Sequence, residues 1–293
     1  MTATTTFDIR PLEATFGATV RGVRLPDLDE AAFARLHELW LEFALLILPD
    51  QHLTIDEQNA FARRFGELEF EASPLANVHR DGALRPDDGT DDMVKILRGN
   101  MDWHPDSTYL PVQAKGAVFT AHVVPARGGE TEFADMRAAY DALDEATRRR
   151  VDGLRAHHSL YHSQRDVGDH DGRGAGYSGY GFFGQEPPLR PLVKVHPETG
   201  RRSLLVGRHA YGIPGLPDEE SERLLADLVE HACRPPRVHT HRWRPGDAVV
   251  WDNRCLLHRA RPWDMTEPRV MYHARIAGDP ATESADRGVA RPS

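Results

Sequence analysis

The spacing of apolar residues along the chain predicts four helices. Apolar side chains recur every three or four positions, as on one face of a helix, in residues 27–43, 54–66, 136–153 and 216–232. The second helix also carries boundary signals, because Thr54 is a favourable N-cap residue and Gly66 can end a helix.

Shorter runs rich in β-branched and aromatic residues predict strands at residues 44–49, 93–97, 116–125, 191–207, 238–253 and 268–278. Residues 191–207 indicate a hairpin around the turn PETG, and residues 238–253 contain the turn PGD. Strands joined by hairpins argue against a doubly wound parallel sheet. We therefore predict an α+β fold with a jelly-roll (double-stranded β-helix) core of antiparallel strands and surrounding helices.

The domain organisation is simple, because the 293 residues contain no internal repeat and no low-complexity linker. We expect one domain over residues 1–293, with a lid loop at the glycine-rich residues 163–188. Aromatic side chains in this loop suit stacking on an aryl ring, and they equally suit packing of the loop over the barrel. These residues are Tyr177, Tyr180, Phe182 and Phe183.

Composition and charge narrow the classes of partner. The net charge is −9 and the lysines and arginines are scattered, so no basic surface for nucleic acid is expected. The two cysteines, Cys233 and Cys255, lack the spacing of a zinc knuckle and fit a reducing cytosol. The N-terminal residues do not form a secretory signal, and the most apolar stretch, residues 39–49, is too short to cross a bilayer. We expect a soluble cytoplasmic protein with no membrane or nucleic-acid partner.

The stretch WHPDSTY contains a candidate metal site. On an extended backbone His104 and Asp106 point to the same side, and His258, which follows a strong strand, could supply a third ligand. Two histidines and one carboxylate form the facial triad of non-haem Fe(II) oxygenases, which leaves positions open for other molecules. A His-x-Asp pair also occurs in ordinary turns. A hydrolytic zinc site is not supported, because no HExxH motif is present.

A late strand carries candidate anion anchors. In PRVMYHARIAG the odd-numbered residues share one face, which places Arg269, His273 and Arg275 together. We expect Arg269 on the strand next to that of His258. Arginine binds a carboxylate with two parallel hydrogen bonds, so this face suits an anion-binding cavity. A solvated barrel exterior would also accommodate these residues.

The motifs WHPDSTY, GGETEFADM, WDNRCLLHRA and RVMYHARIAGD together resemble the taurine dioxygenase-like family of Fe(II)- and 2-oxoglutarate-dependent dioxygenases, in order and spacing over essentially the whole chain. The resemblance implies that His104, Asp106 and His258 hold Fe(II). It also implies that Arg269 and Thr131 bind the distal carboxylate of the cosubstrate 2-oxoglutarate. The glycines before Thr131 would allow a close approach of the backbone.

Within that family the chain is similar to the aryloxyalkanoate dioxygenases of the (S)-2-aryloxypropionate (dichlorprop) type. The similarity rests on GNMDWHPDSTY, ADMRAAYDALDEATR, RPLVKVHPETGR, LLVGRHAYGIPG and VVWDNRCLLHRARPWD. It implies hydroxylation beside an ether oxygen and collapse to a phenol and a 2-oxo acid, with succinate and CO2 as coproducts. Dioxygen would be the oxidant, and ascorbate an activator in vitro.

The resemblance also suggests substrate-binding residues, each of which could instead be a structural hydrogen-bonding group. Arg275 and His209 are the candidates to bind a substrate carboxylate, with Arg208 in reserve and Asn100 in the pocket wall. His273 stands where sulfonate-binding members have an arginine, which argues against taurine. We also expect Glu71 to line the pocket, where it could contact an amine or a hydroxyl.

Alternative functions remain open. The same iron site could oxidise taurine, an alkylsulfonate or an amino-acid-derived carboxylate, and a binding barrel without redox chemistry would keep the fold. The five core residues, His104, Asp106, Thr131, His258 and Arg269, are all present, which argues against the binding barrel. The sequence thus predicts a dioxygenase that takes a small carboxylate substrate and forms a homo-oligomer.

Overall fold

The largest element of the computed structural model is a seven-stranded sheet of order β1-β2-β3-β13-β5-β15-β4. The structure describes residues 7–164 and 186–285, so the predicted lid lies mostly outside the described residues. All neighbouring strands of the sheet are antiparallel except β2 and β3. The strands are β1 (Asp8–Pro11), β2 (Ala18–Arg21), β3 (Leu45–Leu48), β4 (Leu68–Ala76), β5 (Gly116–Val123), β13 (Ala248–Asp252) and β15 (Val270–Ile276).

A second sheet of order β12-β6-β14 faces this one across a buried layer. It contains β12 (Val238–His241), β6 (Thr131–Asp135) and β14 (Leu256–Ala260). Phe119 and Trp251 of the large sheet pack with Phe133 and Leu256 of the small one, and these side chains form the interior of the barrel. The predicted α+β fold with an antiparallel jelly-roll core is confirmed.

Two small sheets complete the strand set. One has the order β11-β7-β8, with β7 (Arg155–His158), β8 (Leu189–Pro191) and β11 (Ala210–Tyr211). The other pairs β9 (Val193–Val195) with β10 (Arg202–Leu204), which confirms the predicted hairpin around PETG.

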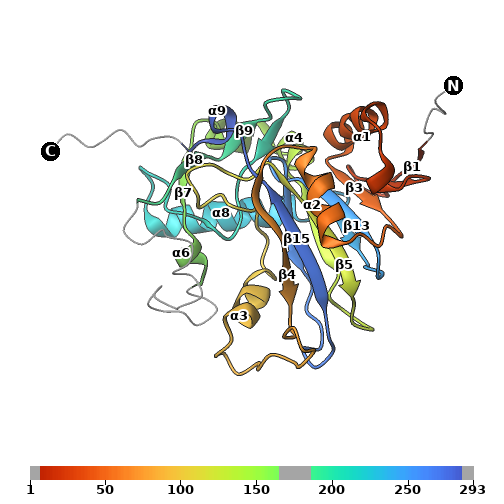
Figure 1. The fold of residues 1–293 in the computed structure, drawn as a ribbon. Coiled ribbons are helices and arrows are strands. Elements are labelled where there is room, and N and C mark those ends of the chain that lie inside the picture. Colours follow the sequence, from red (N-terminus) through yellow and green to blue (C-terminus); the bar gives the residue numbers. More distant parts are fainter. Residues whose placement is uncertain (1–6, 165–185, 286–293) are drawn as a thin grey trace.

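Helices cover the outer surfaces of the sheets (Figure 1). The short helix η1 (Leu25–Asp27), α1 (Glu30–Phe43) and α2 (Ile55–Arg63) pack against the large sheet and bury a layer of leucine, phenylalanine and tryptophan side chains. Helix α2 begins with a capping box in which Thr54 and Glu57 satisfy each other's main-chain N–H groups. Helices α4 (Met136–Asp141) and α8 (Asp218–Ala232) form a second apolar cluster behind β10 and β14. The remaining helices are α3 (Asp92–Gly99), α5 (Glu145–Val151), α6 (Leu160–Gln164) and α9 (Pro280–Glu283).

Two local predictions are wrong. Residues 93–97 form part of helix α3 rather than a strand, because Asp91 caps the helix and a stretch of five residues is too short to define a period. Residues 136–153 form two helices, since Asp144 accepts a hydrogen bond from the Thr147 N–H and starts a new one. The predicted PGD turn is present at Pro245 and Gly246, but β12 and β13 on either side of it do not pair with each other: β12 pairs with β6, whereas β13 pairs with β3 and β5.

Within residues 7–164 and 186–285 no helix is both long and apolar enough to cross a membrane.

Candidate active site

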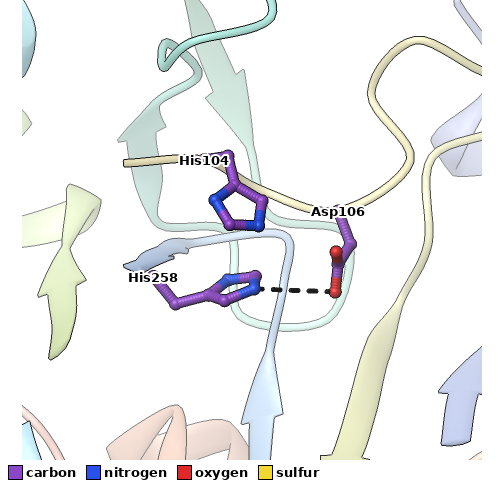
Figure 2. Close-up of side chains that lie close together, drawn as sticks. All are labelled: His104, Asp106 and His258. Carbon is purple, nitrogen blue, oxygen red and sulfur yellow. Dashed lines mark ion pairs between the residues drawn. The ribbon is translucent and has the colours of Figure 1, made fainter. Parts of the chain in front are cut away.

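The three predicted metal ligands come together in one buried cluster. Figure 2 shows His104 and Asp106 on one loop and His258 on β14. Main-chain hydrogen bonds of 3.0 and 2.9 Å join His104 to His258 in both directions, so the two ligand-bearing segments are fixed to each other. Asp106 lies in a turn and not on a strand, so the predicted strand geometry is wrong although the two side chains converge.

The ligand atoms of this cluster fit a metal ion. One nitrogen or oxygen from each side chain lies within 4.8 Å of the other two. The Nδ1 atom of His104 is 2.7 Å from the Asp102 carbonyl, which must accept, so Nε2 keeps its lone pair for a metal. The Oδ2 atom of Asp106 lies 3.8 Å from Nε2 of His258 and, although it is buried, has no hydrogen-bond donor in the part of the chain that the structure describes. A cation would satisfy this oxygen.

The charges of these groups also suit metal binding. Burial lowers the pKa of His104 well below its usual value and also lowers that of His258, so both rings are neutral. Burial would raise the pKa of Asp106, but the positive charge of the nearby Arg275 guanidinium opposes it and the pKa lies below its usual range. Two neutral imidazoles and one carboxylate are the ionisation states that a divalent cation requires.

A cavity of about 290 Å³ opens at the triad. One wall is apolar and comes from α3, which contributes Met93, Ile96 and Leu97. The same cavity reaches the basic side chains of β15 and the ends of β6 and β14. Predicted site residues that line it are Asn100, His104, Asp106, Thr131, Arg208, His209, His258, Arg269, His273 and Arg275.

Arg269 is a buried cation without an acidic partner in the described part of the chain. It is 2% exposed, its Nε donates to the Gly129 carbonyl at 3.2 Å, and its guanidinium lies 5.0 Å from the Trp263 ring centroid. Burial lowers the pKa of Arg269 to about 10, so the group remains charged at neutral pH. Such a cation in a cavity wall is suited to receive an anion.

The surroundings of Arg269 agree with the predicted motif but not with the predicted strand order. Gly129 has φ +69°, and a Cβ there would lie 3.1 Å from Nε of Arg269, so glycine permits the close approach. The Thr131 hydroxyl accepts a hydrogen bond of 2.9 Å from the Trp243 indole. Arg269 precedes β15 in the large sheet, whereas His258 lies in the facing sheet, so the two are not on neighbouring strands.

Arg275 contacts the triad itself. It donates to Oδ1 of Asp106 at 3.0 Å and to the Ser107 hydroxyl at 2.9 Å, and it lies 3.3 Å from Oε1 of Glu69. Phe70 packs under the guanidinium, with 4.6 Å between the carbon and the ring centroid. Arg275 therefore connects the carboxylate of Asp106, the predicted metal ligand, with the cavity wall.

Two histidines stand beside the triad. His209 lies with its ring 5.9 Å from that of His104, and its Nδ1 is 2.9 Å from the Ser163 hydroxyl. His273 stacks on Trp251, and its Nε2 lies 3.5 Å from Oδ2 of Asp106. Burial lowers the pKa of His273 to about 3 and also lowers that of His209 well below its usual value. Both rings are neutral hydrogen-bonding groups in the cavity wall.

Glu71 was predicted to line the pocket and does not. Its side chain is 66% exposed and pairs with Arg63 at the surface. The register between β4 and β15 shifts between Ser73 and Phe70, so the regular alternation of faces is interrupted there. The acidic residue that approaches the site is Glu69, whose carboxylate accepts from the Ser107 hydroxyl at 2.9 Å.

Three contributors to the site are not among the residues predicted from the sequence: the α3 wall, Trp243 and Tyr109. The α3 wall was missed because its residues were predicted as a strand. Trp243 was missed because nothing in the chain marks it as the partner of Thr131. Tyr109, three residues after Asp106, also lines the cavity, and its place in the WHPDSTY segment could have suggested this.

A second group of possible ligands is already saturated. His196, Asp252 and Cys255 lie close together, but Asp252 accepts hydrogen bonds from Arg254 at 2.8 and 2.6 Å and is 3.0 Å from Nε2 of His196. The Arg254 guanidinium occupies the place of a cation, so this group is a structural network.

Comparison with known proteins agrees with this site. The family "Taurine catabolism dioxygenase TauD, TfdA family" matches residues 8–275. The chain is 64% identical to the (S)-phenoxypropionate/alpha-ketoglutarate-dioxygenase of Sphingobium herbicidovorans, over 95% of this chain and 98% of that protein. It is 58% identical to the protein of the same name from Delftia acidovorans, over 96% and 98%.

A solved structure shows the same fold. The crystal structure of AAD-2 in complex with Mn(II) and N-oxalylglycine superposes with a TM-score of 0.88 at 36% identity, over 96% of this chain and 99% of that one. The described strands and helices thus follow the architecture of a metal-binding relative. The chain belongs to the taurine catabolism dioxygenase TauD, TfdA family, as its motifs predicted.

Proposed function

We propose that this protein is an Fe(II)- and 2-oxoglutarate-dependent dioxygenase that cleaves the ether bond of a 2-aryloxypropionate, giving a phenol, a 2-oxo acid, succinate and CO2. One observation supports the proposal most directly. A single cavity joins the His104, Asp106 and His258 cluster to two buried guanidinium groups, Arg269 and Arg275. Two carboxylate-bearing molecules must meet at the metal in this reaction, and each would find its own cation.

The residues of the triad fit Fe(II), and the open side of the cluster faces the cavity. When bound, iron together with 2-oxoglutarate and dioxygen supplies the oxidising chemistry that replaces a C–H bond with a C–OH bond. The protein provides the two neutral imidazoles and the carboxylate, and it buries them so that water is excluded.

We assign the Arg269 end of the cavity to the distal carboxylate of 2-oxoglutarate. Arg269 has no acidic partner among residues 7–164 and 186–285, so an incoming carboxylate would offset the cost of its burial. The Thr131 hydroxyl, held by Trp243, offers an additional hydrogen bond at this end.

We assign the carboxylate of the second molecule to Arg275, with His209 and Arg208 beside it in the cavity wall. The α3 residues Met93 and Ile96 offer an apolar surface that suits an aryl ring. The names of the two relatives from Sphingobium and Delftia favour the (S) enantiomer. The match of the family to residues 8–275 supports one domain for the whole chain.

The deciding experiment compares substrates in air with Fe(II), ascorbate and 2-oxoglutarate, and it measures succinate and phenol together. The substrates are the two enantiomers of a 2-aryloxypropionate, taurine, and no addition. Phenol formed in step with succinate for the (S) enantiomer supports the proposal. Succinate release stimulated by taurine, or by none of the three compounds above the level without substrate, would contradict the assigned substrate.

Two variants make the same experiment specific for the triad. Asp106→Ala should abolish turnover, because the metal loses its only anionic ligand. Asp102→Ala is the matched control, since this exposed side chain is nearby and only the main-chain carbonyl of Asp102 contacts His104. Full activity of Asp106→Ala would exclude the triad.

A further inference from the structure

We propose that Asn253 and Arg190 are positioning residues that hold the turn carrying Asp106, and that they thereby set the affinity of the triad for its metal; this inference rests on the metal site of the proposed function. Neither side chain lines the cavity. Each reaches the turn from a different element, Asn253 from the connection between β13 and β14 and Arg190 from β8.

Asn253 fixes the main chain on both sides of Asp106. Its Oδ1 accepts from the Asp106 N–H at 2.7 Å, and its Nδ2 donates to the Asp106 carbonyl at 2.9 Å. The second Nδ2 hydrogen bond goes to the Ala114 carbonyl at 3.0 Å, and the side chain is 1% exposed. Because Asn253 lies five residues before His258, one short segment holds the Asp106 main chain and leads directly to another ligand.

The turn needs such support. Ser107, the residue after Asp106, has φ +57°, a left-handed conformation that is strained for a non-glycine residue. Asp106 itself is a buried carboxylate next to this strained residue. A turn of this kind persists only where neighbouring groups hold it in place.

Arg190 holds the other end of the turn. It donates to the Thr108 carbonyl at 2.7 Å, to the Leu110 carbonyl at 2.7 Å and to the Glu283 carbonyl at 3.1 Å. The side chain is 2% exposed, and burial lowers its pKa to about 10, although Glu283 opposes the shift. A buried guanidinium with three hydrogen bonds to main-chain carbonyls fixes the path of the chain from Thr108 to Leu110, directly after the residues that Asn253 holds.

The consequence is a dependence of metal affinity on side chains that never contact the metal. Ligand atoms must lie within a few tenths of an ångström of their bonding positions, and groups that orient ligands typically change metal affinity about 10- to 100-fold. A general structural role would lower stability and leave the affinity of the folded protein unchanged. A measurement of metal affinity on the folded protein therefore distinguishes a positioning role from a general structural role.

The test is a titration of the metal-free full-length protein with Mn(II), in which electron paramagnetic resonance counts the free ion. The variants are Asn253→Ala and Arg190→Lys; the lysine keeps the charge but cannot reach three separated carbonyls. We expect the dissociation constant for Mn(II) to rise about tenfold or more in each variant.

Two residues remote from the cavity provide matched controls. Gln51 makes the same three kinds of hydrogen bond as Asn253, since it accepts from the Leu25 N–H at 3.0 Å and donates to the carbonyls of Val23 at 3.0 Å and Pro49 at 3.1 Å. Arg64 donates to the Leu28 carbonyl at 2.6 Å and to the Asp29 carbonyl at 3.2 Å. Gln51→Ala and Arg64→Lys should lower the unfolding midpoint without changing Mn(II) affinity.

The outcomes separate this inference from the proposed function. Folded Asn253→Ala and Arg190→Lys proteins that bind Mn(II) as tightly as wild type would overturn the inference. If Asn253→Ala does not fold, Asn253→Asp replaces it, because the acid keeps the acceptor for the Asp106 N–H and loses both donors. If wild type and His104→Ala bind Mn(II) equally, the metal site itself is wrong.

Discussion

The two cavity arginines are given different roles by their immediate neighbours. Arg269 lies against a carbonyl and an indole ring and has no acidic partner among the described residues. Arg275 already contacts the carboxylates of Asp106 and Glu69. A cation whose charge is not balanced attracts an incoming anion more strongly, so Arg269 should contribute more to the binding of its carboxylate ligand than Arg275.

The residue to test is therefore Arg269. Arg269→Lys keeps the charge but loses the planar pair of donors, which is worth about 1.5–3 kcal/mol for a hydrogen-bonded carboxylate. We expect the affinity of the Mn(II)-loaded protein for 2-oxoglutarate, measured by calorimetry, to fall about tenfold or more. The affinity for Mn(II) should not change.

The exposed Arg242, just after β12, provides the control for this measurement. Arg242→Lys should bind 2-oxoglutarate as wild type does. An unaltered affinity in Arg269→Lys would remove Arg269 from the cosubstrate site.

At the scale of elements, helix α3 forms the apolar wall of the cavity. Two polar contacts of Asp91 stabilise the start of this helix. The Asp91 side chain accepts a hydrogen bond from the Val94 N–H at 3.0 Å and pairs with Arg85 at 3.0 Å. Three apolar side chains of α3, Met93, Ile96 and Leu97, line the cavity. The position of this wall should therefore respond to the stability of the helix.

Removal of the cap tests this dependence. Asp91→Ala should cost the helix about 1 kcal/mol, as for other N-cap aspartates. We expect KM for the aryloxypropionate to rise several-fold while KM for 2-oxoglutarate stays constant, because Arg269 is held by Gly129 and Trp263, neither of which belongs to α3. Steady-state kinetics with each substrate varied in turn gives both values.

Asp88→Ala is the matched control, since Asp88 accepts hydrogen bonds from Thr90 in the exposed turn before α3. It should leave both KM values unchanged. A parallel rise of both KM values in Asp91→Ala would show that the helix affects the whole site.

At the scale of the whole molecule, the buried histidines make stability depend on pH. His104, His158, His209 and His273 are buried, and burial lowers the pKa of each. Below pH 6.5 the unfolded chain binds protons at these positions that the folded protein does not bind. The free energy of unfolding should therefore fall as the pH decreases from 6.5, and above 6.5 these groups have no effect.

His158 isolates this effect from metal binding. Its pKa in the folded protein is lowered to about 3 by burial and by Arg190, and neither ring nitrogen has a hydrogen-bond partner among residues 7–164 and 186–285. In urea unfolding of the metal-free protein, the loss of stability between pH 7.5 and 5.5 should be smaller in His158→Leu by about 1 kcal/mol. The exposed His79 gives the control His79→Leu, whose pH dependence should match wild type; an equal pH dependence in His158→Leu would contradict the assignment.

The sequence by itself predicted the family, because several motifs resemble it in order and spacing. It also predicted His104, Asp106 and His258 as one cluster, which the structure brings together. The metal-binding role of this cluster and the role of Arg269 as a carboxylate anchor stay predictions. Periodicity also located the long helices, whose apolar faces span several turns.

Only the tertiary structure decided which neighbours complete the site. Glu69 approaches Arg275 while Glu71 faces solvent, because an irregularity between β4 and β15 interrupts the alternation that a sequence pattern assumes. Residues 93–97 belong to helix α3. Their apolar side chains form part of the site only because the fold places the helix beside the cavity. The contacts of Asn253 and Arg190 with the Asp106 turn join segments 147 and 82 residues apart in the chain. No local pattern encodes such contacts, since they arise from the packing of β8, β13 and β14 around the turn.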